Sequence, residues 1–153
     1  NLQGILTTSG IQTMAAVTTN DKTRFGSFRT AIRMARVVGR VNPTAIVVNP
    51  TQGEWIDTAA DSQNRFYGPG PFFSEANRRL WGVPVVESEA VPAGTAVVGD
   101  YSKAVLWDRE QATVSATDSH ADFFIRNLLA ILAEMRVAFG VLDPEAFCTV
   151  TAV

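Results

Sequence analysis

A helix signal followed closely by a strand signal in the first third of the chain most constrains the fold. Over residues 21–38, apolar side chains recur every three or four positions with arginines between them, which predicts an amphipathic helix. Asn20 or Asp21 is its expected N-cap, and Gly39 is its expected end. The apolar run over residues 44–49 is rich in β-branched residues and predicts a buried strand. Together they indicate a helix packed on a sheet.

The middle of the chain carries one more helix signal and then a series of strand signals. Pro50 stands at a plausible first helical position, before Glu54, Trp55 and Ile56. Residues 64–73 contain two Gly-Pro pairs and predict an exposed loop. Short strands separated by turns are expected at residues 83–87, 95–98, 104–107 and 113–117.

The last third predicts a second long helix and two strands. The helix is expected over residues 121–137, with Asp118 or Ser119 as its cap. Its buried stripe would comprise Phe124, Leu128, Ile131, Leu132 and Met135. Strands are expected over residues 137–142 and 146–153. Because helices and strands alternate only at the start, the pattern favours an α+β fold with a mixed sheet over a doubly wound fold.

Composition and residue types exclude several classes of function. Lys and Arg number 13 and Asp and Glu 15, so a net charge of −2 disfavours a DNA-binding module. The single cysteine and single histidine allow no internal disulfide and no multi-histidine metal site, and no cofactor is expected. Cys148 lies in an apolar stretch and is expected to be a buried, inert thiol.

No catalytic motif stands out. Asp118, Ser119 and His120 are the residue types of a nucleophilic triad, but adjacent side chains cannot form the relay, so helix capping is the better interpretation. The Gly68–Gly70 loop lacks the strand-to-helix context of a phosphate-binding loop. The arginines of the first helix form a basic face that is either solvated or in contact with an acidic neighbour or nucleic acid: Arg29, Arg33, Arg36 and Arg40.

Several motifs in the same order resemble the major capsid proteins of tailed bacteriophages, which have the Hong Kong 97-type fold. They are Ile46-Val-Val-Asn-Pro50, Asn64-Arg-Phe-Tyr-Gly-Pro69, Leu80-Trp-Gly-Val-Pro-Val-Val86, Ala90-Val-Pro-Ala-Gly-Thr95, Val97-Val-Gly-Asp-Tyr101, Leu106-Trp-Asp-Arg109 and Asp143-Pro-Glu-Ala-Phe147. The likeness runs from Gly4 to near the end of the chain.

The resemblance implies a structural subunit of a phage or prophage capsid. Residues 1–106 and 137–153 would form the axial domain, a mixed sheet with flanking helices, and residues 107–136 part of the peripheral domain, with a long helix and strands. The family's N-terminal arm, extended loop and spine helix would precede Asn1, so the chain would be a C-terminal portion. Identical subunits would be its main partners, in hexamers and pentamers around double-stranded DNA that is touched only weakly. Scaffold, protease and portal proteins are further expected partners, and no membrane is expected. The protein would be found in the virion capsid, and in the host bacterial cytoplasm during assembly.

Site residues also follow from the resemblance. The loop at the symmetry axis and two tryptophans would form subunit interfaces: Arg65, Phe66, Tyr67, Gly68, Pro69, Trp81 and Trp107. In cross-linking members of the family, a lysine of the extended loop attacks an asparagine side chain of another subunit, and a glutamate acts as the base. Asn127 and Glu134 fall at those positions, on one face of the expected helix and about 10 Å apart along it. The protein would otherwise not be an enzyme.

Two other functions stay open at this stage. The nearest is an encapsulin-like nanocompartment shell, which has the same fold and packages enzymes. The other is a small α/β ligand-binding or hydrolase domain, with Glu54, Asp57 and Asp61 around a pocket beside the Gly68–Gly70 loop.

Overall fold

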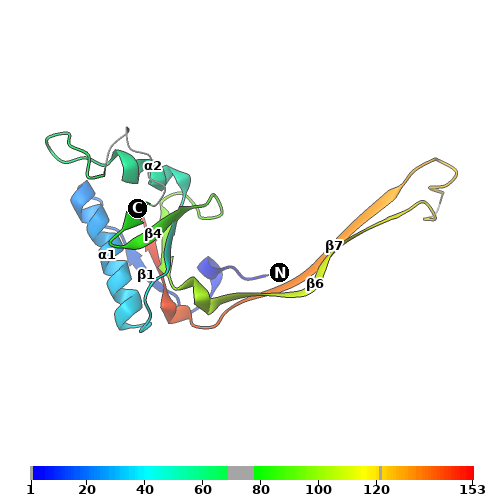
Figure 1. Cartoon of the computed structure of the whole chain (residues 1–153), viewed down its shortest axis with the longest axis horizontal. Coiled ribbons are helices and arrows are strands. Elements are labelled where there is room, and N and C mark those ends of the chain that lie inside the picture. Colours follow the sequence, from blue (N-terminus) through cyan, green and yellow to red (C-terminus); the bar gives the residue numbers. More distant parts are fainter. Residues whose placement is uncertain (1, 69–77, 121) are drawn as a thin grey trace.

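A six-stranded mixed sheet forms the centre of the body in the computed structural model, which describes residues 2–68, 78–120 and 122–153. The strand order is β1-β8-β5-β2-β4-β3. The bounds are Gln12–Ala15 (β1), Ala45–Val48 (β2), Arg79–Leu80 (β3), Val83–Glu87 (β4), Thr95–Gly99 (β5) and Phe147–Thr151 (β8). The pairs β1–β8 and β2–β4 are parallel and the other pairs antiparallel. The predicted α+β class with a mixed sheet is confirmed (Figure 1).

Helix α1, Asp21–Val37, is the first expected helix with nearly its expected bounds. The Asn20 side chain accepts a hydrogen bond from the Thr23 backbone N–H, and the Thr23 hydroxyl accepts one from the Asn20 N–H, which completes a capping box. Four residues at helical spacing are buried against the sheet: Phe28, Ala31, Ile32 and Ala35. At the other end, a Cβ on Gly39 would lie 2.4 Å from the Glu145 carbonyl oxygen, so only glycine fits this close approach.

Helix α2, Pro50–Thr58, follows β2 directly and confirms the helix expected at Pro50. Asn49 caps it by accepting a hydrogen bond from the Thr51 N–H, and Pro50 occupies the first turn. Ile56 is buried in the same core as α1, and the Trp55 indole N–H donates to the Asp21 carboxylate at 3.1 Å. The two helices are therefore tied to each other as well as to the sheet.

The two faces of the sheet carry separate apolar clusters because successive side chains of a strand point to opposite faces. On the helix side, Ile46, Val98 and Val150 pack against α1. On the other side, Val97 and Phe147 pack with Tyr101 and the N-terminal Ile5. Cys148 is fully buried, as expected, and burial raises the pKa of its thiol to about 11.

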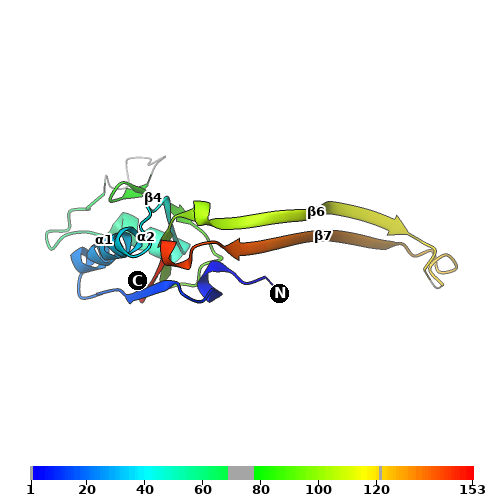
Figure 2. The same cartoon turned by 90° about the horizontal axis from the view of Figure 1, so that it is seen from below.

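A long two-stranded ribbon projects from this body (Figures 1 and 2). It comprises β6, Ala104–Thr117, and β7, Ala130–Val141, paired antiparallel from Ala104 opposite Val141 to Thr117 opposite Ala130. The two strands expected at residues 104–107 and 113–117 are parts of β6, with register shifts between Asp108 and Thr113. Most side chains of the ribbon are exposed.

The helix expected over residues 121–137 is wrong, because its second half is strand β7 and its first half is the turn at the ribbon tip. The expected buried stripe is exposed: Phe124, Leu128, Ile131, Leu132 and Met135. Asp118 and Ser119 therefore cap no helix. The physical reason is that β6 supplies hydrogen-bond partners to the backbone of β7, which a local apolar spacing does not encode.

Candidate assembly surfaces

The loop expected at a subunit interface is held by its own hydrogen bonds and presents its aromatic side chains to solvent. The Asp61 carboxylate accepts hydrogen bonds from the Gln63 and Arg65 backbone N–H groups at 2.8 and 2.9 Å. Phe66 is 47% exposed and Tyr67 52% exposed. Arg65 and Gly68 are exposed as well, and Pro69 lies outside the described residues.

Trp81 stands at the tip of the tight turn between β3 and β4. Its φ is +53° and that of Gly82 is +84°, the pattern of a type I′ turn, in which Asn and Gly are the usual residues. The Trp81 ring is 58% exposed, and its indole N–H donates to the Phe25 carbonyl oxygen at 3.4 Å. A bulky residue in this backbone conformation is strained by about 1–2 kcal/mol.

Phe25 of α1 brings the loop and the turn together. The Tyr67 ring packs edge-on against the Phe25 ring, with centroids 5.7 Å apart, and Trp55 packs on Phe25 with centroids 4.9 Å apart. The Trp81 indole is held beside these rings by its hydrogen bond to the Phe25 carbonyl oxygen, and the four residues are called here the aromatic cluster, which is partly exposed. The structure thus joins Tyr67 and Trp81, which are separate in the sequence.

Trp107 does not belong to this cluster. It lies near the base of the ribbon, opposite Ala138 on β7, and is 48% exposed. A Cβ on Gly140 would lie 3.0 Å from the Trp107 ring, so the glycine leaves room for the indole.

Asn127 and Glu134 lie on the ribbon and not on a helix, so the expected shared helix face is wrong. Asn127 is in the tip turn, with a φ of +53° that asparagine tolerates better than most residues. Glu134 lies in β7, opposite Thr113. Both residues are exposed.

Two features of these surfaces were not predicted from the sequence. One is the ribbon itself, whose exposed apolar residues include Val114 and Ile131. Its signal was the strand pattern on both sides of residues 118–129, a hairpin spacing hidden by the helical spacing of the apolar residues. The other is Arg78, whose guanidinium pairs with both Asp57 of α2 and Glu87 of β4. No local pattern indicates that pairing.

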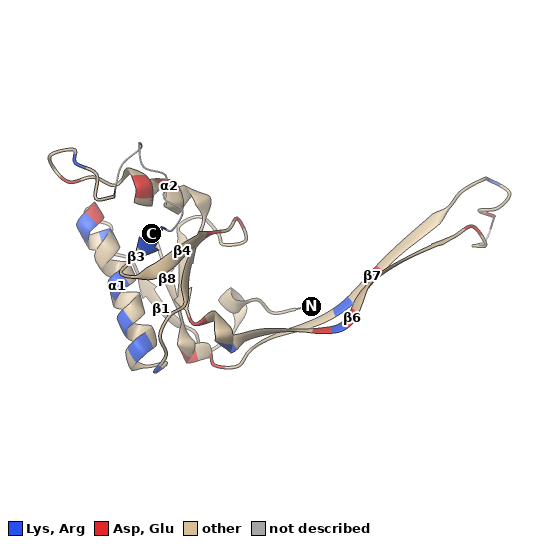
Figure 3. Cartoon of the chain, viewed as in Figure 1, with Lys and Arg blue, Asp and Glu red and all other residues tan. Residues whose placement is uncertain are grey.

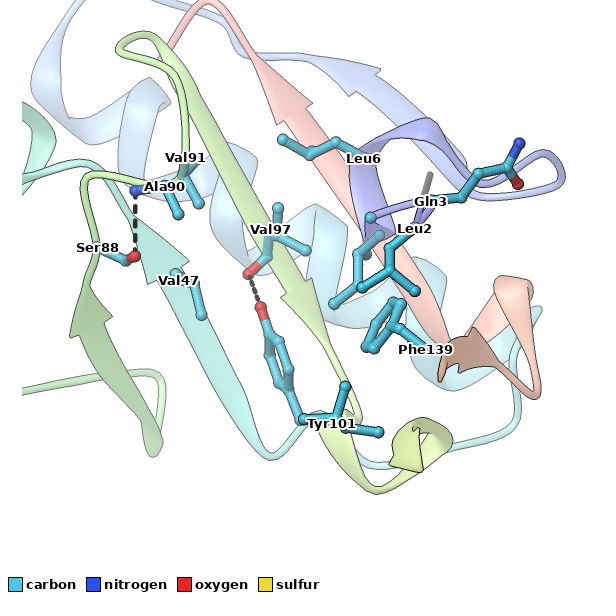
Figure 4. A pocket seen from close by; sticks show the side chains of 13 residues that line it. Leu2, Gln3, Leu6, Val47, Ser88, Ala90, Val91, Val97, Tyr101 and Phe139 are labelled. Carbon is cyan, nitrogen blue, oxygen red and sulfur yellow. Dashed lines mark hydrogen bonds between the residues drawn. The ribbon is translucent and has the colours of Figure 1, made fainter. Parts of the chain in front are cut away.

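An apolar hollow of about 520 Å³ lies between the N-terminal segment and the sheet face opposite α1 (Figure 4). Leu2, Ile5 and Leu6 line one side, and Val47, Val97 and Phe139 are among the residues of the other. The Tyr101 hydroxyl donates to the Val97 carbonyl oxygen at 3.4 Å, and burial raises the pKa of this phenol. None of the described residues that line the hollow carries a charged side chain.

The carboxylates of the hydrolase alternative do not meet at this hollow. Glu54, Asp57 and Asp61 are absent from its lining, and the latter two are engaged with Arg78 and with loop backbone. Among the described residues, no group of three or more His, Cys, Asp or Glu side chains is placed to hold a metal ion. Neither described helix is long and apolar enough to cross a membrane.

Comparison with known proteins shows to which family a chain with this sheet body and ribbon belongs. The sequence model described as "Phage capsid family" matches residues 1–152. The chain belongs to the phage capsid family. It is 38% identical over 104 residues to the major capsid protein of Enterobacteria phage HK97, which is 67% of this chain and 27% of that protein. The resemblance to Hong Kong 97-type capsid proteins is therefore confirmed.

Solved capsid structures share the whole fold of this family member. The capsid of an empty GTA particle has a TM-score of 0.77 at 18% identity, over 98% of this chain and 56% of that one. The Gordonia phage Cozz structure has a TM-score of 0.69 at 21% identity, over 97% of this chain and 51% of that one. A virus-like particle from Pyrococcus furiosus has a TM-score of 0.62 at 13% identity, over 95% and 57%. The chain thus spans about half the length of these capsid chains, and about a quarter of the HK97 protein.

Proposed function

We propose that the chain is a structural subunit of an icosahedral phage or prophage capsid, which assembles with identical copies into hexamers and pentamers around double-stranded DNA. Family membership and the identity to the HK97 major capsid protein support this role. The same identity favours a phage capsid over an encapsulin-like shell, since the virus-like particle is only 13% identical. Scaffold, protease and portal proteins would be further partners, in the host cytoplasm before the virion is complete.

The observation that carries the proposal is the exposed apolar surface of the ribbon. A two-stranded ribbon is marginally stable by itself in water and needs a third element or a packed face. Here Val114 of β6 is 72% exposed and Ile131 of β7 is 70% exposed. Figure 2 shows that the ribbon extends away from the body. Surfaces of this kind mark protein interaction sites, and neighbouring subunits of a shell would cover them.

The place where the ribbon leaves the body supports the proposed division into domains. We assign residues 1–106 and 137–153 to the axial domain and residues 107–136 to the peripheral domain. The start of β6 at Ala104 and the end of β7 at Val141 support these limits, since both lie within a few residues of them.

Replacing one exposed apolar residue of the ribbon tests the proposal. Ile131→Asp should leave the free energy of unfolding within about 0.5 kcal/mol of the wild type, because the side chain is exposed. It should abolish the ring-shaped assemblies expected in negative-stain microscopy and light scattering of the purified chain. Gln111→Asp, an exposed polar position on β6, is the matched control and should assemble normally. A wild-type chain that stays a compact monomer at every concentration would contradict the role.

The aromatic cluster would form contacts around the symmetry axis. Its support is that Tyr67, which packs on the Phe25 ring, and Trp81, which donates to the Phe25 carbonyl oxygen, are about half exposed. Phe66 is about half exposed as well and lies next to Tyr67 in the loop. Arg65, Gly68 and Pro69 belong to the same loop, and Trp107 would contact a neighbour at the base of the ribbon. Tyr67→Ser should weaken ring formation more than it lowers the stability of the monomer, whereas equal loss of both would point to a packing role.

Cross-linking through Asn127 is the finer part of the proposal. A lysine amine of another subunit would attack the amide carbon of Asn127, the new C–N bond would form, and ammonia would leave. Glu134 of a further subunit would accept the proton of the lysine ammonium. Support comes from the exposure of both residues on a ribbon that projects away from the body (Figure 1). On denaturing gels, mature particles should give ladders that Asn127→Asp abolishes, whereas monomers from wild-type particles would exclude the reaction.

A further inference from the structure

The outer face of α1 carries a row of basic side chains, Lys22, Arg29, Arg33 and Arg36, and Arg40 follows just beyond the end of the helix. These five residues are called here the basic stripe. At 100° per residue the four helical positions fall within about 60° of one another around the helix axis. From Lys22 to Arg36 the row is about 21 Å long at 1.5 Å per residue. All five side chains are exposed, and Figure 3 shows the basic positions along α1.

The stripe has no acidic counterpart within its own chain among residues 2–68, 78–120 and 122–153, where the ion pairs involve other cations. The one acidic residue of α1, Asp21, is turned toward Trp55 and the Ala60 backbone and accepts hydrogen bonds from both. Four like charges on one helix face, with a fifth just beyond the helix end, cost self-repulsion, so a partner of opposite charge would stabilise them.

A second surface of the body is acidic, called here the acidic edge: Glu54, Asp57, Glu87 and Glu89. A Cβ on Gly53 would collide with the Glu87 carboxylate, which shows that the Glu87 side chain lies against Gly53, the neighbour of Glu54 in the sequence. The Asn49 side chain donates to the Val91 carbonyl oxygen at 2.8 Å and holds the turn after β4 against the start of α2. Arg78 pairs with Asp57 and Glu87, which leaves Glu54 and Glu89 without an ion pair among the described residues.

We propose that the basic stripe of one copy docks on the acidic edge of the next copy around the capsomer axis. This inference rests on the proposed shell function and names the contact between neighbouring subunits. The two surfaces lie on different elements of the body, α1 on one side and α2 with the turn after β4 on another (Figure 3). Rotation about an axis brings two such different surfaces together in every pair, which closes a ring of identical copies.

Charge favours a second copy over nucleic acid as the occupant of the stripe. The chain has a net charge of −2, so its overall field repels a polyanion. Every copy of the chain carries both the basic stripe and the acidic edge, so the two surfaces are present in equal numbers. Complementary charged surfaces of this kind fix how two subunits align and disfavour wrong contacts. The salt dependence of ring formation would then come mainly from this contact.

Charge reversal on each surface, followed by mixing, tests the contact. Arg29→Glu with Arg33→Glu places two carboxylates in the middle of the basic stripe, and Glu54→Lys with Glu89→Lys places two ammonium groups on the acidic edge. Both pairs are exposed, so the variants should fold. In sedimentation velocity experiments, the association constant for ring formation should be at least tenfold lower for each variant alone than for the wild type. An equimolar mixture should recover it in rings where the two variants alternate, because the new carboxylates of one variant then face the new ammonium groups of the other and the remaining contacts are wild-type. Arg29→Lys with Arg33→Lys keeps the charge and is the matched control, which should assemble.

Each outcome decides between the possibilities. For the wild type, raising the salt from about 0.1 M to about 1 M shortens the Debye length from about 10 Å to about 3 Å and should also weaken the rings. Wild-type rings that neither reversal affects would overturn the contact and leave the shell function standing. Binding of a duplex oligonucleotide that Arg29→Glu with Arg33→Glu abolishes, without recovery of rings in the mixture, would assign the stripe to nucleic acid instead. A chain that is monomeric under all conditions would contradict the shell function as well.

Discussion

Two identical substitutions at different places measure how unevenly the chain is stabilised. Phe28 of α1 is fully buried between the helix and the sheet, whereas Phe124 at the ribbon tip is 79% exposed. Replacing a buried Phe with Ala removes apolar contacts and leaves a cavity, which costs about 3–5 kcal/mol. Only about a fifth of the Phe124 surface is covered, so Phe124→Ala should cost under about 1 kcal/mol.

Urea denaturation followed by circular dichroism and tryptophan fluorescence measures both free energies. With a slope of about 2 kcal/mol per molar urea, Phe28→Ala should lower the unfolding midpoint by about 2 M, and Phe124→Ala by less than about 0.5 M. The slope itself should stay unchanged in both variants.

The comparison also separates the ribbon from the helix that the sequence suggested. A helix over residues 121–137 would bury Phe124 in a stripe with Leu128, and both Phe substitutions would then cost similar amounts. Equal losses for Phe28→Ala and Phe124→Ala in the monomer would therefore refute the structural reasoning, as would a loss below about 1 kcal/mol at Phe28.

Three further predictions concern local features of the body. Gly39→Ala should lower the free energy of unfolding by about 1–3 kcal/mol, because the new Cβ would meet the Glu145 carbonyl oxygen. Gly26→Ala should raise the free energy of unfolding by about 0.5–1 kcal/mol, because Gly26 lies inside α1 with open space around it. Urea denaturation that shows the same sign for both substitutions would be inconsistent with the packing. Asn20→Ala removes the capping box of α1 and should cost about 1 kcal/mol in the same assay, and a neutral effect would show that the cap contributes nothing. Burial raises the pKa of the Cys148 thiol from 9.0 to about 11, so above about pH 9 the thiol ionises first in the unfolded chain and the free energy of unfolding should fall as pH rises. Urea denaturation between about pH 8 and about pH 11 should show a steeper fall in the free energy of unfolding for the wild type than for Cys148→Ala. Parallel curves for the two proteins would contradict the burial effect.

Elements with strong local signals were predictable from the residues alone. The capping residue and the helical spacing of α1 act within a few positions of one another, so they define the helix before any packing, whereas Gly39 is required by its close approach to the Glu145 carbonyl oxygen. The β-branched runs of β2, β4 and β5 are likewise local, and the buried state of Cys148 follows from the apolar stretch around it. The order of motifs, read as a resemblance, identified the family without the structure.

The ribbon could not be predicted from local sequence patterns. Residues 130–141 have apolar side chains at a spacing that suits a helix as well as a strand, and the choice depends on pairing with residues 104–117 across the tip turn. The same long-range pairing separates Asn127 in the turn from Glu134 on the strand. Contacts between α1, α2 and the turn after β4 then place the basic stripe and the acidic edge on different surfaces. Backbone pairing and surface placement join residues far apart in the chain, so a pattern of neighbouring residues carries no information on them.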